Sequence, residues 1–183
     1  LVDSGNFPWK QHADKFPRLN TPDVSYHGVV YTDAFGPAAF IGRARVVPLR
    51  NMGAAISPFN SFLILQGIET LAVRMDRICE NSLAVARYLQ KHPKVRWVNY
   101  AGLPDHPGHA LAQKYMGGRA SGILTFGIDG GRAAGARFQD ALGLFVRLVN
   151  IGDAKSLACH PASTTHRQLN PAELEKAGVS EDM

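Results

Sequence analysis

Apolar residues recur three and four positions apart between residues 59 and 89, which predicts one long helix over residues 57–91. They are Phe59, Phe62, Leu63, Leu65, Ile68, Leu71, Ala72, Met75, Ile78, Leu83, Ala86 and Leu89. Ser57-Pro58 suits the helix start. A serine oxygen accepts from free backbone N–H groups, and proline lacks the N–H that would have no partner at the first position. We expect a bend at Gly67 and an end at His92-Pro93.

The pattern changes after residue 92, where short apolar stretches alternate with short helical ones. The expected strands are 95–100, 122–128 (buried) and 145–151, and the expected helices are 107–116, 131–142 and 172–176. Asn170-Pro171 caps the last helix and Gly178 closes it. This alternation predicts an α/β fold, in which helices cover one face of a small sheet.

Residues 1–55 are rich in proline, glycine and aromatic residues and lack clear periodicity. Residues 27–31 suit either a short strand or a covered loop, and a helix beginning near Pro37 is expected to become irregular before Arg50. The segment therefore resembles an arm packed on a larger scaffold. Because a helix as long as 57–91 often bridges two domains, we place a domain boundary near residues 71–77.

Composition narrows the class of protein. The chain has 183 residues, of which 45% are hydrophobic, so it is long enough for one domain or a domain plus part of another. No apolar run reaches the roughly 18–20 residues that span a bilayer. The net charge of +5 comes from scattered residues and does not favour a nucleic-acid partner. We therefore expect neither a nucleic-acid nor a membrane partner.

The cysteines and the chain ends add two expectations. The two cysteines form no CxxC pair, which indicates a reducing, cytoplasmic compartment and no structural zinc site. The chain opens on Leu1 rather than Met and stops at Met183 just after a helix-like stretch. We therefore expect it to be a piece of a longer polypeptide.

Several motifs are weak candidates for chemistry. Lys155-Ser156 resembles the end of a phosphate loop, but Ala154 stands where that loop needs glycine. Cys159-His160 suits a buried cysteine beside a loop histidine better than a nucleophile and its base. His106-x-x-His109 lacks a third metal ligand nearby. The loose cluster Arg43, Arg45 and Arg50 suits a solvated face, with an anion contact as the alternative.

Two polar loops, 150–156 and 160–166, are stronger candidates. They follow an expected strand and concentrate Asn, Ser, Thr and His donors. A strand end that runs into such a loop is a common place for a ligand, so one reading is a rim that binds an anion or carboxylate. The other is a turn-rich edge that satisfies its own backbone.

These loops carry a family resemblance. The stretches 150–157 and 160–166 resemble the Cys/Met-metabolism family of enzymes that depend on pyridoxal 5'-phosphate (PLP), and in particular its sulfhydrylase branch. Further matching stretches are 3–9, 25–29, 57–60, 66–71, 74–75 and 98–103. The resemblance runs from end to end of the chain.

The resemblance implies a fold-type I architecture. Residues 1–70 would be the C-terminal remainder of the large PLP-binding domain, and residues 71–183 a truncated small C-terminal α/β domain reached through the long helix. Members of the family are usually homotetramers, built as dimers of dimers that share active sites.

The implied reaction belongs to methionine biosynthesis and transsulfuration. It is a γ-replacement that makes L-homocysteine from O-acetyl-L-homoserine and sulfide. Methionine γ-lyase and cystathionine γ-synthase relatives remain alternatives, as does a non-catalytic scaffold or assembly fragment that associates with a companion N-terminal half.

The resemblance also implies which site residues this chain carries. Asn150 takes the place of a residue that contacts the substrate α-carboxylate, Thr165 matches a threonine that positions the carboxylate-gripping arginine, and Ser156 is a weaker substrate-binding candidate. The family's Schiff-base lysine stands in a Ser-x-Thr-Lys motif, which none of the seven lysines here occupies. We therefore expect no catalytic or cofactor-binding residue in this chain, and no activity from the chain alone.

Overall fold

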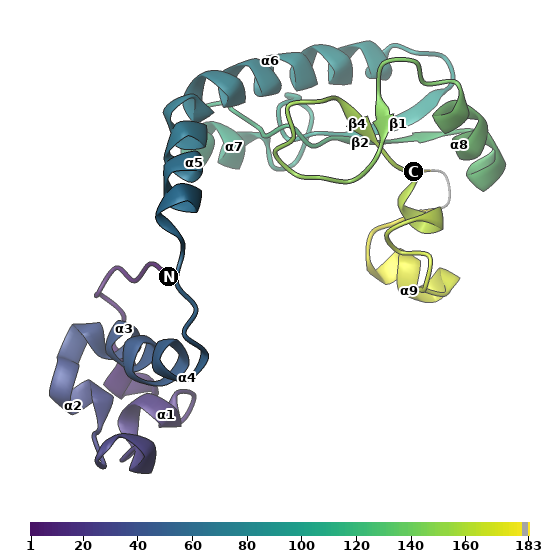
Figure 1. Ribbon diagram of the computed structural model, residues 1–183. Helices are drawn as coiled ribbons and strands as arrows, with labels where there is room; N and C mark the ends of the chain where they lie inside the picture. Colours follow the sequence, from purple (N-terminus) through teal and green to yellow (C-terminus); the bar gives the residue numbers. More distant parts are fainter. Residues whose placement is uncertain (181–182) are drawn as a thin grey trace. The chain divides into compact units, whose positions relative to one another are not determined.

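The computed structural model describes residues 1–180 and 183, and it shows a mixed α/β chain that is mostly helical with two small sheets (Figure 1). The chain divides into two compact units, Leu1–Leu65 and Gln66–Met183. Within the described residues, no helix combines the length and apolar character needed to cross a membrane.

The first unit consists of short helices, and its second half is a succession of α-, 3-10- and π-helical turns. The prediction of a helix near Pro37 that becomes irregular before Arg50 is confirmed in part: α3 (Ala39–Ala44) is followed by a π-helical turn, but helical structure then continues to residue 52. A π-helical turn at Arg45–Leu49 accommodates Pro48, which has no N–H to donate. Its elements are η1 Trp9–His12, α1 Pro17–Asn20, η2 Val24–Tyr26, α2 Tyr31–Phe35, η3 Gly36–Ala38, α3 Ala39–Ala44, η4 Arg45–Leu49 and α4 Arg50–Met52.

Residues 27–31 form a loop rather than a strand. A single antiparallel bridge joins Asp23 to Val29, and His27 adopts a left-handed backbone with φ 56°. The loop leads into α2 at Tyr31, which forms a small buried core with Leu19 and Ala39. The Tyr31 hydroxyl donates to Asp23 Oδ2 at 2.8 Å, so the loop and the small core of this unit are tied together.

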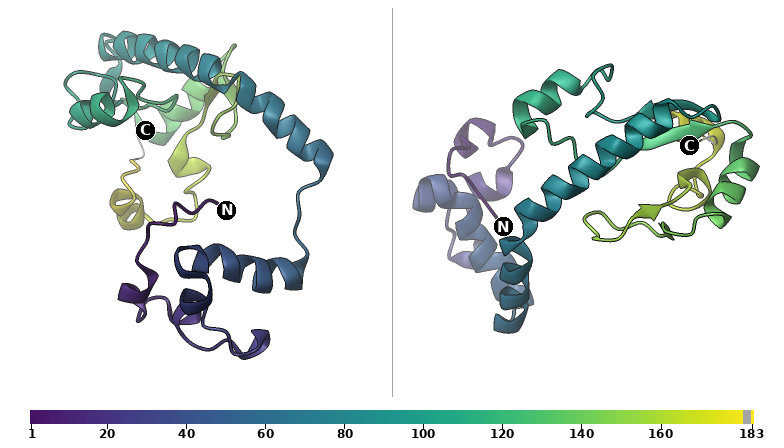
Figure 2. Two further views of the ribbon diagram at one scale, coloured as in Figure 1. Left: turned by 90° about the vertical axis from the view of Figure 1, so that its left-hand side faces the viewer. Right: turned by 90° about the horizontal axis from the view of Figure 1, so that it is seen from above.

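The long helix predicted over 57–91 is two helices, α5 (Pro58–Glu69) and α6 (Leu71–Gln90). Ser57 caps α5 as expected, since its Oγ accepts from Asn60 N at 3.1 Å. The break lies at Thr70 and not at Gly67. The Arg74 guanidinium donates to the Gly67 carbonyl at 2.6 Å, which satisfies an acceptor at the end of α5. Figure 2 shows α6 as one unbroken helix.

The second unit holds both sheets. β1 (Val95–Asn99) pairs antiparallel with β2 (Thr125–Ile128), and β3 (Val146–Arg147) pairs parallel with β4 (Leu157–Ala158). The strand expected over 145–151 is therefore only two residues long, and β4 was not predicted. The strand expected to be buried is half-buried apart from Gly127.

The remaining helices of this unit follow the predicted order. They are α7 His109–Met116, α8 Gly131–Asp140, η5 Pro161–Ser163 and α9 Pro171–Lys176. The capping box expected before α9 is present: Asn170 Oδ1 accepts from Glu173 N at 3.0 Å, and Glu173 Oε2 accepts from Asn170 N at 2.9 Å. A core of Ala86, Tyr100, Leu103, Ala112 and Ala120 lies between α6, α7 and the loops that flank them.

Candidate functional site

Asn150 lies in an exposed turn between β3 and β4. Its Nδ2 donates to Asp153 Oδ2 at 3.0 Å, and Asp153 Oδ1 accepts from Lys155 N at 2.9 Å. The Lys155 N–H and the Asn150 amide together lower the pKa of Asp153, since both bonds favour the carboxylate. Asp153 thus shapes the turn, while one Asn150 Nδ2 hydrogen remains for another acceptor.

The second polar loop is organised around His160, which is only 5% exposed. Its carbonyl accepts from Thr164 Oγ1 at 2.8 Å, and its Nδ1 lies 2.8 Å from Ser163 Oγ. Thr165, the next residue, is exposed, and its Oγ1 lies 2.9 Å from His166 Nδ1. The loop backbone is therefore fixed from inside, while the Thr165 hydroxyl faces outward.

Asn150, Ser156 and Thr165 are all on the exposed surface of the second unit. Ser156 contributes its carbonyl to Val146 N at 2.9 Å, beside the β3–β4 pair, and its side chain is exposed. No hydrogen bond joins any two of the three residues. The structure thus leaves all three side chains accessible but does not assemble them into an enclosed site.

The two histidines of the His106-x-x-His109 motif have hydrogen-bond partners close by in the chain. His106 Nε2 lies 2.7 Å from Asn99 Oδ1 and His106 Nδ1 accepts from Gly108 N at 2.9 Å, while His109 Nδ1 lies 3.1 Å from the Ala101 carbonyl. Among the described residues, no three His, Cys, Asp or Glu side chains are grouped to hold a metal ion.

Cys159 is half-buried, and burial raises the pKa of its thiol, which disfavours the thiolate that a nucleophile needs. The sequence predicts a buried side chain at Cys159 and a loop residue at His160. The structure reverses this, because His160 is the buried member of the pair. The one sequence signal for the burial of His160 is Gly135. This glycine interrupts the alanine-rich helix α8 and lies against the His160 ring.

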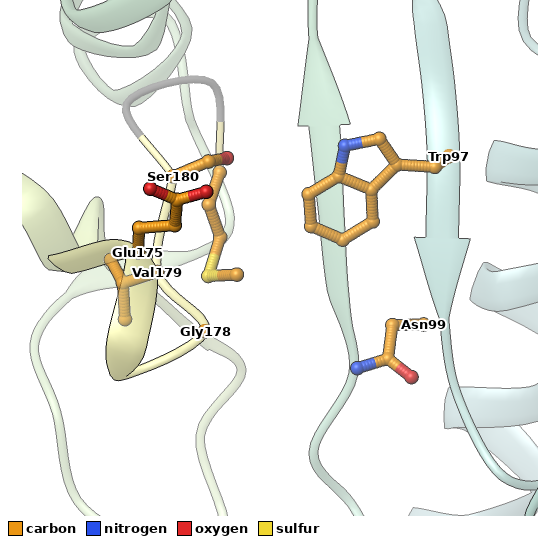
Figure 3. A pocket seen from close by; sticks show the side chains of 7 residues that line it. Trp97, Asn99, Glu175, Gly178, Val179 and Ser180 are labelled. Atoms are coloured by element: carbon orange, nitrogen blue, oxygen red, sulfur yellow. The ribbon is translucent and has the colours of Figure 1, made fainter. Parts of the chain in front are cut away.

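Figure 3 shows a pocket of about 420 Å³ in the second unit. Trp97 and Asn99 of β1 face it from one side. Glu175 of α9 and the residues that follow this helix face it from the other. The lining residues are Trp97, Asn99, Glu175, Gly178, Val179, Ser180 and Met183. None is a predicted site residue, so the predicted substrate contacts lie outside this pocket.

The lysines of this chain do not fit the attachment of PLP. All seven are exposed, and Lys10 is ion-paired with Asp33 at 2.6 Å. An amine that reacts with a carbonyl near neutral pH needs a desolvated or electropositive pocket that lowers its pKa. No lysine among the described residues has such an enclosure.

Comparisons with known proteins agree with the sequence motifs. The family model described as "Cys/Met metabolism PLP-dependent enzyme" matches residues 3–183. O-acetyl-L-homoserine sulfhydrylase 1 of Thermus thermophilus is 50% identical over 183 residues, and homocysteine synthase of Schizosaccharomyces pombe is 46% identical over 183 residues. Each alignment covers 100% of this chain and 43% of the relative, so the chain spans less than half of their length.

Solved structures give the same result. A putative O-acetylhomoserine (thiol)-lyase of Campylobacter jejuni, which carries a pyridoxyl-lysine phosphate, matches with a TM-score of 0.82 and 42% identity. The match covers 92% of this chain and 40% of that one. O-acetylhomoserine sulfhydrylase of Wolinella succinogenes matches with a TM-score of 0.70 and 33% identity, over 99% of this chain and 44% of that one. The family inferred from the loops is confirmed: this chain belongs to the Cys/Met metabolism family of PLP-dependent enzymes.

Proposed function

We propose that the full-length protein containing this chain is an O-acetylhomoserine sulfhydrylase, which makes L-homocysteine from O-acetyl-L-homoserine and sulfide. The observation that carries the proposal is the end-to-end similarity to sulfhydrylases and homocysteine synthases at 42–50% identity. The reaction belongs to methionine biosynthesis, and the two free cysteines suit a reducing, cytoplasmic compartment.

In this proposal, the chain contributes contacts to the substrate carboxylate. Asn150 supplies an N–H donor, because only one of its two Nδ2 hydrogens is directed at Asp153. The Thr165 hydroxyl has lone pairs that orient an arginine N–H, and that arginine grips the carboxylate. Ser156 is the weakest of the three, since its side chain is exposed and its carbonyl serves the β3–β4 pair.

PLP would be held by residues of the full-length protein outside this chain. That assignment rests on the exposed lysines and on the absence of the Ser-x-Thr-Lys motif. PLP acts as the electron sink for carbanion chemistry when it is bound. We assign residues 1–70 to the large PLP-binding domain and 71–183 to the small domain.

The exposed surface of α5 indicates that the chain functions as part of a larger assembly. Its apolar side chains lie on every face of the helix, and six of them are at least half exposed: Phe59, Phe62, Leu63, Ile64, Leu65 and Ile68. A helix that is apolar all round belongs in a protein interior. We infer that the rest of the enzyme covers it, in a homotetramer built as a dimer of dimers.

The same exposed helix favours one second candidate. In this second candidate, the chain acts as an assembly fragment and docks on a companion polypeptide that carries the cofactor. Co-expression with a separate N-terminal half separates the two ideas: an active complex of two polypeptides supports the fragment, whereas activity only from one continuous chain supports the first proposal.

Substrate competition in the full-length, PLP-loaded enzyme tests the reaction. We expect homocysteine from O-acetyl-L-homoserine and sulfide, and much slower use of O-succinylhomoserine with cysteine or cleavage of methionine. Asn150→Ala and Thr165→Val are expected to raise the KM for the amino-acid substrate about tenfold, because one charge-assisted hydrogen bond stabilises binding by roughly 1.5–3 kcal/mol. Preference for the succinyl ester or for methionine would assign the protein to another branch of the family.

A further inference from the structure

His160 is a buried polar side chain in a loop whose hydroxyl side chains, Ser163, Thr164 and Thr165, are exposed. It is 5% exposed, and within the described residues only Thr32 is another buried polar or charged residue. Burying an imidazole has a free-energy cost that hydrogen bonds must offset. We therefore expect the buried His160 side chain to fix the position of neighbouring residues in the loop.

The hydrogen bonds of His160 fix the turn that leads to Thr165. Nδ1 lies 2.8 Å from Ser163 Oγ, and the His160 carbonyl accepts from Thr164 Oγ1 at 2.8 Å and from Ser163 N at 3.2 Å. The turn continues with His166 N donating to the Pro161 carbonyl at 2.9 Å. Side chain and backbone of His160 thus set the path of residues 161–166.

The ring of His160 is seated against α8 where that helix has no side chain. An ideal Cβ on Gly135 would lie 2.7 Å from His160 Cδ2, closer than carbon atoms pack, and 3.2 Å from Nε2. Nearby, the Arg132 guanidinium donates to the Ala162 carbonyl at 3.3 Å. Two contacts therefore hold the loop on α8: the His160 ring packs against Gly135, and Arg132 donates to the Ala162 carbonyl.

We propose that the His160–Gly135 contact is a positioning contact for substrate binding. It holds the 160–166 loop at the distance from α8 that places the Thr165 hydroxyl against the carboxylate-binding arginine. This rests on the proposed role of Thr165. His160 itself is a positioning residue, since it acts through the loop and its ring is directed into the protein.

Gly135→Ala in the full-length, PLP-loaded enzyme is the direct test. The added methyl group displaces the His160 ring and with it the loop, so we expect the KM for the amino-acid substrate to rise at least about fivefold while kcat stays within about twofold, as for lost uniform binding. Gly143→Ala is the matched control, because a Cβ there meets nothing within 4 Å. It is expected to leave both constants unchanged.

A double-mutant cycle shows whether Gly135 acts through the ring. His160→Ala removes the obstacle, so adding Gly135→Ala to His160→Ala is expected to change KM no further. His160→Asn, which restores a donor or acceptor near the Nδ1 position, is expected to recover part of the KM lost in His160→Ala. Equal effects of Gly135→Ala in both backgrounds would overturn the proposal.

Hydrogen exchange over residues 159–169 separates failure of this contact from failure of the proposed reaction. Gly135→Ala is expected to speed exchange in this peptide, whatever substrate the enzyme uses, and Gly143→Ala is not. A wild-type enzyme that rejects O-acetyl-L-homoserine overturns the proposed function, and KM is then compared with the amino acid it does use. Unchanged exchange, or faster exchange with unchanged KM, overturns the positioning role of His160.

Discussion

Replacing Tyr31 with phenylalanine removes one oxygen atom from the core of the first unit and leaves the ring in place. Tyr31 is 0% exposed, and its hydroxyl donates to Asp23 Oδ2 at 2.8 Å. Asp23 Oδ1 also accepts from Ser25 N at 2.9 Å and Ser25 Oγ at 2.6 Å. The substitution therefore deletes one of three hydrogen bonds to this carboxylate.

The expected loss follows from the environment of both partners. A hydrogen bond to a charged group contributes about 1.5–3 kcal/mol to the free energy of unfolding. Phenylalanine leaves no unpaired polar atom of its own, and water can reach the partly exposed Asp23 carboxylate. We therefore expect a loss at the low end, about 1.5 kcal/mol. With a slope of about 1.5 kcal/mol per molar urea, the midpoint of unfolding falls by roughly 1 M.

The two tryptophans allow each unit to be followed separately. Trp9 lies in the first unit, stacked on Phe40 with ring centroids 5.7 Å apart, and Trp97 lies in the second. In a Trp97→Phe background, urea unfolding monitored by fluorescence reports the first unit. The control is Tyr88→Phe, because the Tyr88 side chain is mostly exposed. Tyr31→Phe is expected to lower the Trp9 midpoint, and Tyr88→Phe to leave it unchanged.

The pH dependence of this difference has a definite sign. Burial, and then the bond to Asp23, raise the pKa of Tyr31 from 10.0 to about 12, so its contribution is full below pH 10 and is lost as pH rises toward 12. The bonds from Ser25 and Tyr31 lower the pKa of Asp23 below 3.8, so its contribution is full above that pH and is lost in more acidic solution. A midpoint difference that is absent at pH 7, or that grows above pH 10, would refute this reasoning.

Three further positions test packing and helix capping in the second unit: Leu103 and Asn170 by the urea midpoint followed through Trp97, and Gly127 by the Trp97 emission of the folded protein. Leu103→Ala deletes a side chain that is 1% exposed and is expected to cost about 2–5 kcal/mol; a cost below about 1 kcal/mol would contradict the burial. Asn170→Ala removes the capping box with Glu173 and is expected to cost about 1 kcal/mol, whereas Asn170→Ser should retain most of it. Gly127→Ala places a methyl group against the Trp97 indole, so the Trp97 emission maximum should shift in the folded protein, and an unshifted spectrum would contradict the contact.

Helix ends were the features best predicted from the sequence. Ser57 and Asn170 lie at N-caps, as expected. These features depend on a few consecutive residues, so local sequence specifies them. The break at Thr70 was missed because the apolar spacing continues across it, and the Arg74–Gly67 bond that accompanies it has no sequence signature.

Strand extent was predicted less well, since it depends on partners distant in sequence. The apolar run 145–151 suggested a full strand, but only Val146 and Arg147 pair, with Leu157 and Ala158. Leu148, Val149 and Ile151 are exposed, so the apolar pattern exceeds what this chain buries. The candidate site shows the same limit: the turn at Asp153 follows from its neighbours, whereas the burial of His160 depends on Gly135, 25 positions earlier.

Mapping the lysine that attaches PLP tests the central claim most directly. The full-length enzyme would be loaded with PLP, reduced with borohydride and digested, and the modified peptide sequenced by mass spectrometry. If this chain supplies substrate contacts while the cofactor is held elsewhere, the pyridoxyl group will be found on a lysine outside these 183 residues. A stoichiometric pyridoxyl group on any of the seven lysines of this chain, Lys155 included, would contradict the account.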